Sequence, residues 1–286
     1  MGAAEMSLFL EVKFKGGLGN QLFQYATARR LSVKKRIPWL LFNTDNYQID
    51  AVGRAFGLMN YRIRGSLIHS RLMKNIFQNG TKYNKIISLF PLYGRIEETG
   101  LSLHHFPNNL RLLSSLSGYW QSEFYFKDIR PLLLEELVPH RVPSFPEWMG
   151  GSETVAVHIR RTDYLVENGF GSLTEQYYHD AIEVIRSRVS NPLFVFFSDD
   201  LEWCRRNFKD NGFLFCDDQD WQLDYLQLYL MSKCSHQIIA NSSFSWWGAW
   251  LNANPARQVI RPERPFLDSS LQYESYYPAD WITLKN

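Results

Sequence analysis

A histidine, two arginines and an aspartate follow a short apolar run and are the residues best suited to chemistry in this sequence. Residues 154–157 are β-branched or apolar and predict a buried strand, which is followed by His158, Arg160, Arg161 and Asp163. In an open α/β sheet, ligands bind at the carboxyl ends of the strands. Adjacent arginines are costly to hold together unless they share an anion, and a planar guanidinium binds phosphate in bidentate fashion. The pair therefore indicates a diphosphate site, and the alternative is two salt bridges to the acidic loops that follow.

A second polar cluster follows a predicted strand at 237–240, where a predicted helix begins. It contains one asparagine and three serines, among them Asn241, Ser242 and Ser243. Their side chains and the free backbone N–H groups of the helix start form a cradle suited to an anion. Capping of the helix by Ser243 is the alternative, but capping needs only one hydroxyl. If this turn and the arginine pair follow adjacent strands, they contact one ligand from two sides.

Two acidic pairs are candidates for polar contacts or metal binding. Asp218 and Asp220 have the Asp-x-Asp form with which many enzymes hold a divalent metal through nucleotide phosphates. They precede a predicted helix, however, and acidic residues favour helix N-termini, so we expect a capping role. Asp199 and Asp200 receive the same interpretation, with Asp199 as a further polar contact in the cleft. No hydrolase nucleophile motif and no His-Glu-x-x-His motif is present.

The C-terminal half of the chain has a regular alternation of strands and helices. The predicted strands are 154–159, 193–197, 213–216, 237–240 and 258–260, and the predicted helices are 172–189, 200–208, 221–234 and 243–252. A capping-box pattern, Ser172 to Glu175, opens the first of these helices. Repeated strand–helix alternation is typical of a parallel, doubly wound sheet.

The N-terminal half begins with a strand, a glycine turn and a helix. The strand is predicted at 7–14 and the helix at 21–33, with Asn20 as its N-cap. The turn, 16–20, is neither a dinucleotide fingerprint nor a P-loop, because the third glycine and the Gly-Lys-Ser/Thr signature are missing. A short strand is predicted at 38–43, and the middle of 50–115 has a helical and basic character.

A linker separates the two halves. Residues 138–146 contain three prolines and are followed by Gly150 and Gly151, which together break any regular element. We therefore predict an N-terminal domain over 1–145 and a C-terminal domain over 146–286. An aromatic and polar cluster at 118–123 and a helix at 127–137 precede this boundary.

Composition indicates a folded globular protein. The 286 residues are 45% hydrophobic and 21% charged, and the net charge of +2 is too small to indicate a nucleic-acid partner. Residues 51–96 hold eight basic and no acidic residues, which predicts either peripheral contact with anionic lipid or an ordinary solvated face. The three cysteines have no metal or redox spacing and indicate free buried thiols in a reducing compartment. With no signal-peptide pattern and no membrane span, we expect a cytoplasmic protein, at the inner face of a bacterial membrane if the basic stretch binds lipid.

Four separated segments match one known family when they are taken together. They are residues 16–26, 118–123, 158–164 and 241–250, with the sequences GGLGNQLFQYA, GYWQSE, HIRRTDY and NSSFSWWGAW. This set resembles the signatures of the α-1,2-fucosyltransferases of glycosyltransferase family 11, and the absence of a membrane anchor makes the chain similar to bacterial members. The resemblance extends over nearly the whole chain in the right order.

The resemblance implies a fold and a reaction. The fold is α/β of GT-B type, with two Rossmann-like domains facing a cleft, the C-terminal one a doubly wound parallel sheet that binds GDP-β-L-fucose. The reaction is transfer of L-fucose with inversion to the 2-hydroxyl of a galactose-containing acceptor, without a required metal or other cofactor, in bacterial surface glycan or O-antigen synthesis. Alternatives are another linkage such as α-1,6, or a non-catalytic glycan- or nucleotide-binding protein, which would not need a diphosphate cradle.

The resemblance also implies roles on the donor side. Arg160 matches the motif arginine that contacts the β-phosphate, with Arg161 supporting its loop. Ser242 and Ser243 match positions that touch phosphate, and His158 is expected to contribute backbone contacts near the guanosine. The mechanism is a single displacement with an oxocarbenium-like transition state, in which stabilising the departing diphosphate is the main catalytic need.

Three further roles follow with alternatives. Relatives often carry an aspartate where this chain has Gln227, and Asp224 lies one helical turn earlier, so either residue is a candidate for reading guanine. Asp163 and Glu167 are the carboxylates in range to act as general base, although Asp163 would otherwise hold Arg161. The glycine turn and the aromatic cluster are expected to line the acceptor side of the cleft, through Gly17, Asn20, Gln21, Trp120 and Gln121.

Overall fold

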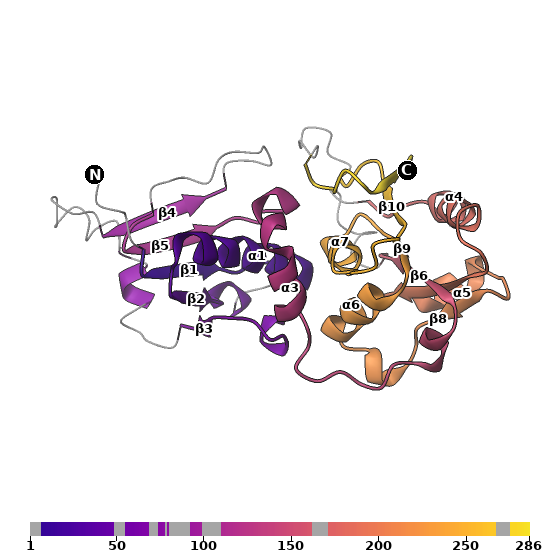
Figure 1. The fold of residues 1–286 in the computed structure, drawn as a ribbon, viewed down its shortest axis with the longest axis horizontal. Helices are drawn as coiled ribbons and strands as arrows, with labels where there is room; N and C mark the ends of the chain where they lie inside the picture. Colours follow the sequence, from indigo (N-terminus) through magenta and orange to yellow (C-terminus); the bar gives the residue numbers. More distant parts are fainter. Residues whose placement is uncertain are drawn as a thin grey trace. The chain divides into compact units, whose positions relative to one another are not determined.

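The computed structural model describes residues 7–48, 55–68, 74–77, 79, 92–98, 110–161, 171–266 and 275–286. The chain divides into two compact units, Met1–Leu137 and Val138–Asn286 (Figure 1). The predicted boundary at residue 145 falls within the second unit, a few residues beyond this division. No helix in the described ranges is long and apolar enough to cross a membrane.

The first unit contains a five-stranded sheet in the order β3-β2-β1-β5-β4, and every strand pair is parallel. Its strands are β1 Phe9–Lys13, β2 Trp39–Asn43, β3 Ser66–Leu67, β4 Tyr93–Glu97 and β5 Leu113–Ser117. Its α-helices include α1 Leu18–Lys35 and α3 Arg130–Glu136, and residues 74–77 and 79 are also helical. Short 3₁₀ turns are η1 Asp45–Gln48, η2 Leu58–Asn60, η3 Glu123–Tyr125 and η4 Lys127–Ile129.

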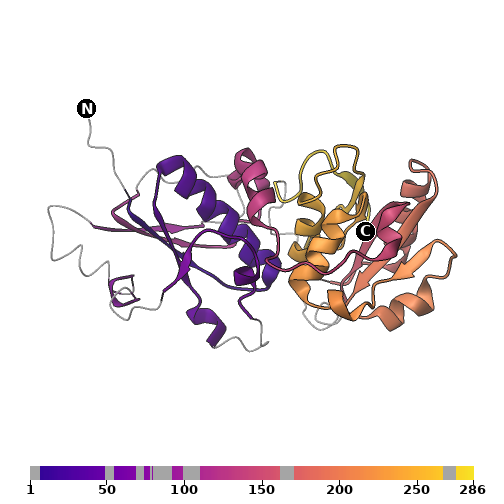
Figure 2. The same ribbon diagram turned by 60° about the horizontal axis from the view of Figure 1, so that its bottom comes forward.

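Helix α1 lies along one face of this sheet (Figure 2). Tyr25 of α1 packs edge-on against Phe42 of β2, with ring centroids 6.3 Å apart. The opposite face of the sheet packs Phe9, Leu41 and Leu113 against other buried side chains. The alternation of side chains along each strand therefore places apolar residues on both faces, as a sheet with two covered faces requires.

The second unit contains a six-stranded parallel sheet in the order β11-β10-β9-β6-β7-β8. Its strands are β6 Glu153–Ile159, β7 Pro192–Ser198, β8 Phe213–Phe215, β9 His236–Ile238, β10 Val259–Pro262 and β11 Ile282–Leu284. Its α-helices are α4 Glu175–Arg186, α5 Leu201–Asn207, α6 Asp224–Lys233 and α7 Ser243–Trp250, with 3₁₀ turns η5 Glu147–Gly150 and η6 Gln219–Trp221.

Helices cover both faces of the second sheet (Figure 1). Val155 and Val157 of β6 pack in one cluster with α4 and α5 residues such as Ala181 and Cys204. Ala156, which points to the other face, packs in a second cluster with α6 residues. The sheet is therefore doubly wound, which confirms the predicted fold class of this half.

The N-caps expected for three helices differ from those in the structure. Helix α1 begins at Leu18 with Gly17 as N-cap, because the turn is completed early by Gly16 at φ 78°, so Asn20 lies inside the helix. Thr174 caps α4 by accepting a hydrogen bond from Tyr177 N at 3.2 Å, in place of Ser172. The predicted start of α7 at Ser243 is confirmed, but the cap is Ser242 and not Ser243.

The predicted helical character of the middle of 50–115 is confirmed where the structure describes it, at residues 74–77 and 79, whereas β3, β4 and β5 lie toward the ends of this stretch. Strand β11 was not predicted. The cysteine prediction is confirmed: Cys204, Cys216 and Cys234 are all free and buried.

Candidate active site

Three strands of the second unit end at the same place and bring the predicted polar clusters together. β6 pairs with β9 and with β7, so that Val157 lies opposite Ile238 and Ile159 lies opposite Ser198. The segments that follow these strands are the arginine pair, the Asp199–Asp200 pair and the serine turn 239–243. The carboxyl edge of a parallel sheet is where ligands bind in α/β folds, so these clusters form the candidate donor site.

Each arginine of the pair has an aspartate partner. Arg160 Nε lies 3.3 Å from Asp199 Oδ2, and Arg161 Nε lies 3.3 Å from Asp200 Oδ2. The backbone N–H of Arg161 also donates to Asp199 Oδ1 at 3.0 Å. The salt bridges considered as the alternative to an anion are therefore present.

The two arginines differ in how firmly they are held. The guanidinium of Arg161 stacks over the Trp203 ring at 3.9 Å, and its side chain is 18% exposed. The Arg160 side chain is 35% exposed. A stacked, ion-paired guanidinium supports the loop, whereas the more exposed one is better placed to contact a ligand.

His158 is buried and is the second-last residue of β6, just before the arginines. Its ring packs against Phe244 with centroids 5.3 Å apart, and Nδ1 has no hydrogen-bond partner in the described part of the chain. Burial, and then the nearby charge of Arg160, lower the pKa of His158 from 6.5 to about 3. The imidazole is therefore neutral at physiological pH and adds no positive charge to the site.

Internal hydrogen bonds use several polar side chains of the serine turn. Ser242 Oγ accepts from Phe244 N at 3.2 Å, and Ser245 Oγ accepts from Ala240 N at 2.9 Å. The Asn241 amide donates to Gly171 O at 3.1 Å. These bonds fix the shape of the turn and leave the half-buried Ser243 as the hydroxyl most accessible to a ligand.

The remaining acidic candidates are helix caps. Asp200 caps α5 by accepting from Trp203 N at 3.0 Å, and Asp218 caps η6 by accepting from Asp220 N at 3.0 Å. In the described ranges no three His, Cys, Asp or Glu side chains are grouped as a metal site.

The two candidates for reading guanine lie one turn apart on α6: Asp224 is exposed and accepts from Tyr225 N, and Gln227 is half-buried. Asp163 and Glu167 lie outside the described residues.

In the first unit, the glycine turn is held tightly by backbone and side-chain hydrogen bonds. The buried Gln21 amide donates to Gly16 O at 3.1 Å and to Ala55 O at 2.9 Å, and it accepts from Gly57 N at 2.9 Å. Gln21 therefore shapes the turn, with its amide group already engaged. Gly17 has open space around it, and no side chain caps the helix that it begins.

The glycine turn and the aromatic cluster meet at the carboxyl edge of the first sheet. Gln121 Nε2 donates to Asn20 Oδ1 at 2.7 Å, which joins two segments that were predicted separately as the acceptor side. Trp120 is buried and has a positive φ of 59°, a conformation that a bulky residue seldom adopts.

Sequence reasoning missed one residue of this region, Glu98. Its carboxylate accepts from the backbone N–H groups of Tyr119 at 2.6 Å and Trp120 at 2.9 Å. Burial raises the Glu98 pKa, and the two hydrogen bonds and Lys15 oppose that rise. An acidic residue directly after a strand was the available signal, but it required strand β4 to be recognised first.

Comparison with known proteins identifies the family. The model of the family described as "Glycosyl transferase family 11" matches residues 3–285. The chain belongs to glycosyltransferase family 11. It is 32% identical to the α-1,2-colitosyltransferase of Escherichia coli over 96% of this chain and 98% of that protein. It is 29% identical to the O-antigen biosynthesis glycosyltransferase WbnK of the same species, over 94% and 98% respectively.

A solved structure supports the fold. The chain aligns with a mutant of Arabidopsis thaliana FUT1 in complex with GDP at a TM-score of 0.51, with 12% identity, over 95% of this chain and 75% of that one. With its two Rossmann-like sheets, the chain has the GT-B fold class implied by the sequence motifs.

Proposed function

We propose that this enzyme transfers L-fucose from GDP-β-L-fucose to the 2-hydroxyl of a galactoside, with inversion, in the synthesis of a bacterial surface glycan such as an O-antigen. The observation that carries the proposal is the edge of the second sheet where Arg160 and the serine turn follow the adjacent strands β6 and β9. An arginine beside a helix N-terminus with an accessible serine suits a diphosphate. The relationship to α-1,2-glycosyltransferases of family 11 supports the donor class and the linkage.

In the reaction we propose, Arg160 exchanges its partner when the donor binds. In the structure Arg160 Nε lies 3.3 Å from Asp199 Oδ2. The β-phosphate of GDP-fucose would take the place of that carboxylate, and Asp199 would still hold the loop through Arg161 N. As the acceptor hydroxyl attacks the anomeric carbon, negative charge grows on the departing GDP, and a positioned guanidinium stabilises it.

Other residues have assisting roles in this proposal. Asp163 or Glu167 removes the proton of the attacking hydroxyl, and Asp224 or Gln227 binds guanine. The Ser243 hydroxyl and the backbone N–H groups behind Ser242 bind phosphate, so that charge is compensated by the protein without a required metal.

We assign the acceptor to the first unit and the donor to the second. On the acceptor side, Gly17 offers an open backbone surface, and the bonded pair Asn20 and Gln121 presents polar atoms beside it. Gln21 and Trp120 act as the rigid support of these groups, because both are buried. We place the enzyme in the cytoplasm, where GDP-sugars are made.

A second donor is favoured by one specific observation, the 32% identity to an α-1,2-colitosyltransferase. Colitose is fucose without its 3-hydroxyl. A site built to hydrogen-bond that hydroxyl would reject the deoxy sugar strongly, because its polar groups would be left unpaired. The two donors can therefore be separated by direct competition.

The experiment is GDP release from GDP-fucose and from GDP-colitose, measured in EDTA against a panel of β-galactosides. The proposal predicts release from GDP-fucose that depends on a galactoside, and a product with fucose on the 2-hydroxyl of galactose. Release from GDP-colitose alone would reassign the donor. A product with another linkage, or activity restored only by added manganese, would contradict the regiochemistry or the metal-independent mechanism respectively.

A further inference from the structure

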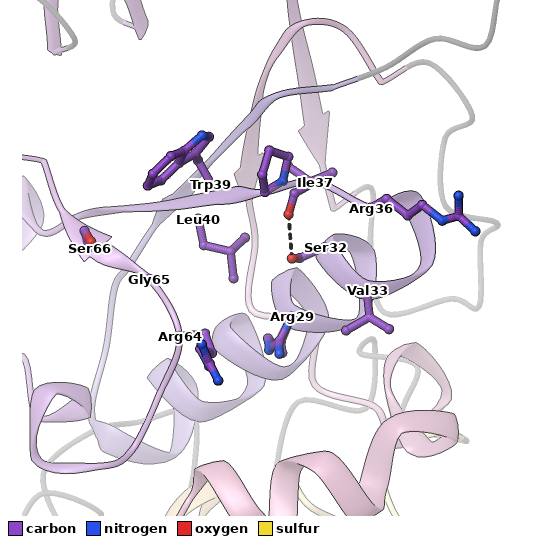
Figure 3. A pocket seen from close by; sticks show the side chains of 11 residues that line it. Arg29, Ser32, Val33, Arg36, Ile37, Trp39, Leu40, Arg64, Gly65 and Ser66 are labelled. Atoms are coloured by element: carbon purple, nitrogen blue, oxygen red, sulfur yellow. Dashed lines mark hydrogen bonds between the residues drawn. The ribbon is translucent and has the colours of Figure 1, made fainter.

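The first unit contains a basic pocket of about 510 Å³ at the end of its sheet opposite to the glycine turn (Figure 3). The pocket lies between the last turns of α1, the start of β2 and the segment before β3. Its lining includes three arginines, Arg29, Arg36 and Arg64, and no aspartate or glutamate. Nothing in the proposed transfer reaction uses this pocket.

The charges of these arginines are not equally compensated. Arg29 forms a bidentate pair with the buried Glu136, at 2.8 to 3.0 Å, and is therefore part of the core. Arg36 and Arg64 are exposed, and neither has an ion-pair partner among the described residues. The favourable interaction of a cation with a helix C-terminus explains the position of Arg36 at the end of α1. It does not explain the position of Arg64, which belongs to a separate segment.

An exposed tryptophan also lines the pocket. Trp39, the first residue of β2, is 57% exposed, and Val33 of α1 is 39% exposed. Figure 3 shows the Trp39 indole and the Arg36 guanidinium extending outward on either side of the turn between α1 and β2. Exposed tryptophan and arginine side chains around one pocket are the pattern of a membrane interface, where tryptophan lies at the headgroup level and basic residues bind lipid phosphate.

Two other described basic residues of the stretch 51–96 have acidic partners. Lys74 is paired with Asp45 at 2.6 Å, and Arg95 lies 3.9 Å from Glu97. Of its described basic residues, Arg62 and Arg64 are the exposed ones without an acidic partner. Of these two residues, Arg64 lines the pocket.

We propose that this pocket and its rim bind an anionic phospholipid bilayer, with Arg64 reaching a headgroup phosphate in the pocket and Arg36 and Trp39 contacting headgroups at the rim. The pocket is at the amino ends of β2 and β3, whereas the glycine turn follows the carboxyl end of β1. Five residues of strand separate these edges, about 16 Å. Lipid binding is therefore separable from chemistry on a soluble acceptor.

The test is sedimentation of the full-length protein with vesicles of phosphatidylcholine alone or mixed with phosphatidylglycerol. We expect binding only to the mixed vesicles, weakened by salt. Because a basic residue near an anionic surface contributes roughly fivefold to partitioning, the double variant Arg36→Gln/Arg64→Gln should bind about 30-fold more weakly. The matched control is Arg188→Gln, which removes an exposed charge on the second unit and should bind nearly as the unchanged protein does.

A second variant, Trp39→Ala, should also lower vesicle binding, while turnover of a soluble galactoside stays unchanged in all variants. The proposal is overturned if the unchanged protein does not bind anionic vesicles. It is overturned as well if the double variant and Arg188→Gln lose vesicle binding equally. It is also overturned if soluble glycerophosphate binds the pocket but vesicles do not, or if the pocket variants change only self-association in sedimentation velocity.

Discussion

The buried carboxylate of Glu136 should be the most sensitive single position for the stability of the first unit. It lies on α3 and accepts hydrogen bonds from Tyr25 Oη at 2.6 Å and from Arg29 at 2.8 to 3.0 Å, both on α1. The Tyr25 hydroxyl also accepts from Arg64 N at 2.9 Å. This network ties the first helix of the unit to its last, and α1 in turn carries the glycine turn.

The cost of Glu136→Ala follows from what it would leave behind. The side chains of Arg29 and Glu136 are only 15% and 8% exposed, and the Tyr25 ring is fully buried. Breaking a buried ion pair by removing one partner costs about 3–5 kcal/mol, since an uncompensated charge remains. Tyr25→Phe, which removes one hydrogen bond to a charged group, should cost about 1.5–3 kcal/mol.

The assay is urea unfolding followed by circular dichroism, with Asp128→Ala as the matched control. Asp128 pairs with Arg30 at 2.9 Å and Lys34 at 3.0 Å, so it also joins α1 to the segment before α3, but on the solvent side. An exposed pair of this kind contributes at most about 1 kcal/mol. If Glu136→Ala is no more destabilising than Asp128→Ala, the reasoning from burial is refuted.

Further predictions concern the second unit. Burial lowers the pKa of His158 to about 3, so below pH 6.5 the unfolded chain takes up a proton that the folded protein does not. The free energy of unfolding should therefore fall by about 2 kcal/mol between pH 7 and pH 5. Urea titrations at several pH values should show that His158→Phe removes this dependence. Asn252→Leu should cost about 2–4 kcal/mol in the same assay, because the buried amide nitrogen shares its two N–H donors among three acceptors, Cys234 O at 2.9 Å, Ser235 O at 3.1 Å and Gln237 Oε1 at 3.0 Å; a change below 1 kcal/mol would contradict this. Gly248→Ala should lower the melting temperature, since a Cβ there would lie 2.8 Å from Met231 Cε and 3.3 Å from its Cβ, unless α6 and α7 move apart freely.

The doubly wound half was predictable from sequence because its strands are apolar on both faces and its helices alternate with them at short intervals. β6 and β7, for example, are nearly continuous apolar runs. By contrast, β5 has the sequence LSSLS, which has little strand propensity. Its buried Ser115 is accommodated because the hydroxyl donates to the buried Glu11 carboxylate at 2.6 Å, a partner 104 residues earlier. Such a pairing has no local sequence signal.

The candidate site divides in the same way. The sequence predicted that the arginine pair and the serine turn contact one ligand if they follow adjacent strands. The pairing of β6 with β9 meets this condition. The partners of each arginine could not be chosen in advance, because Asp199 and Asp200 compete for both and only the fold assigns one to each. The helix caps were misplaced by one to three residues. For α4 and α7 the reason is related, because several serines and threonines at a helix start satisfy the same preference.

The role of Arg160 in stabilising the departing diphosphate can be measured through the kcat of Arg160→Ala with GDP-fucose and a saturating galactoside. Arg205→Ala is the matched control, since Arg205 is also 35% exposed and ion-paired, with Glu202 and Asp217 on the surface of the second unit. We expect kcat to fall by a factor of about 10²–10³ for folded Arg160→Ala and to change little for Arg205→Ala. Near-normal turnover by folded Arg160→Ala would contradict it.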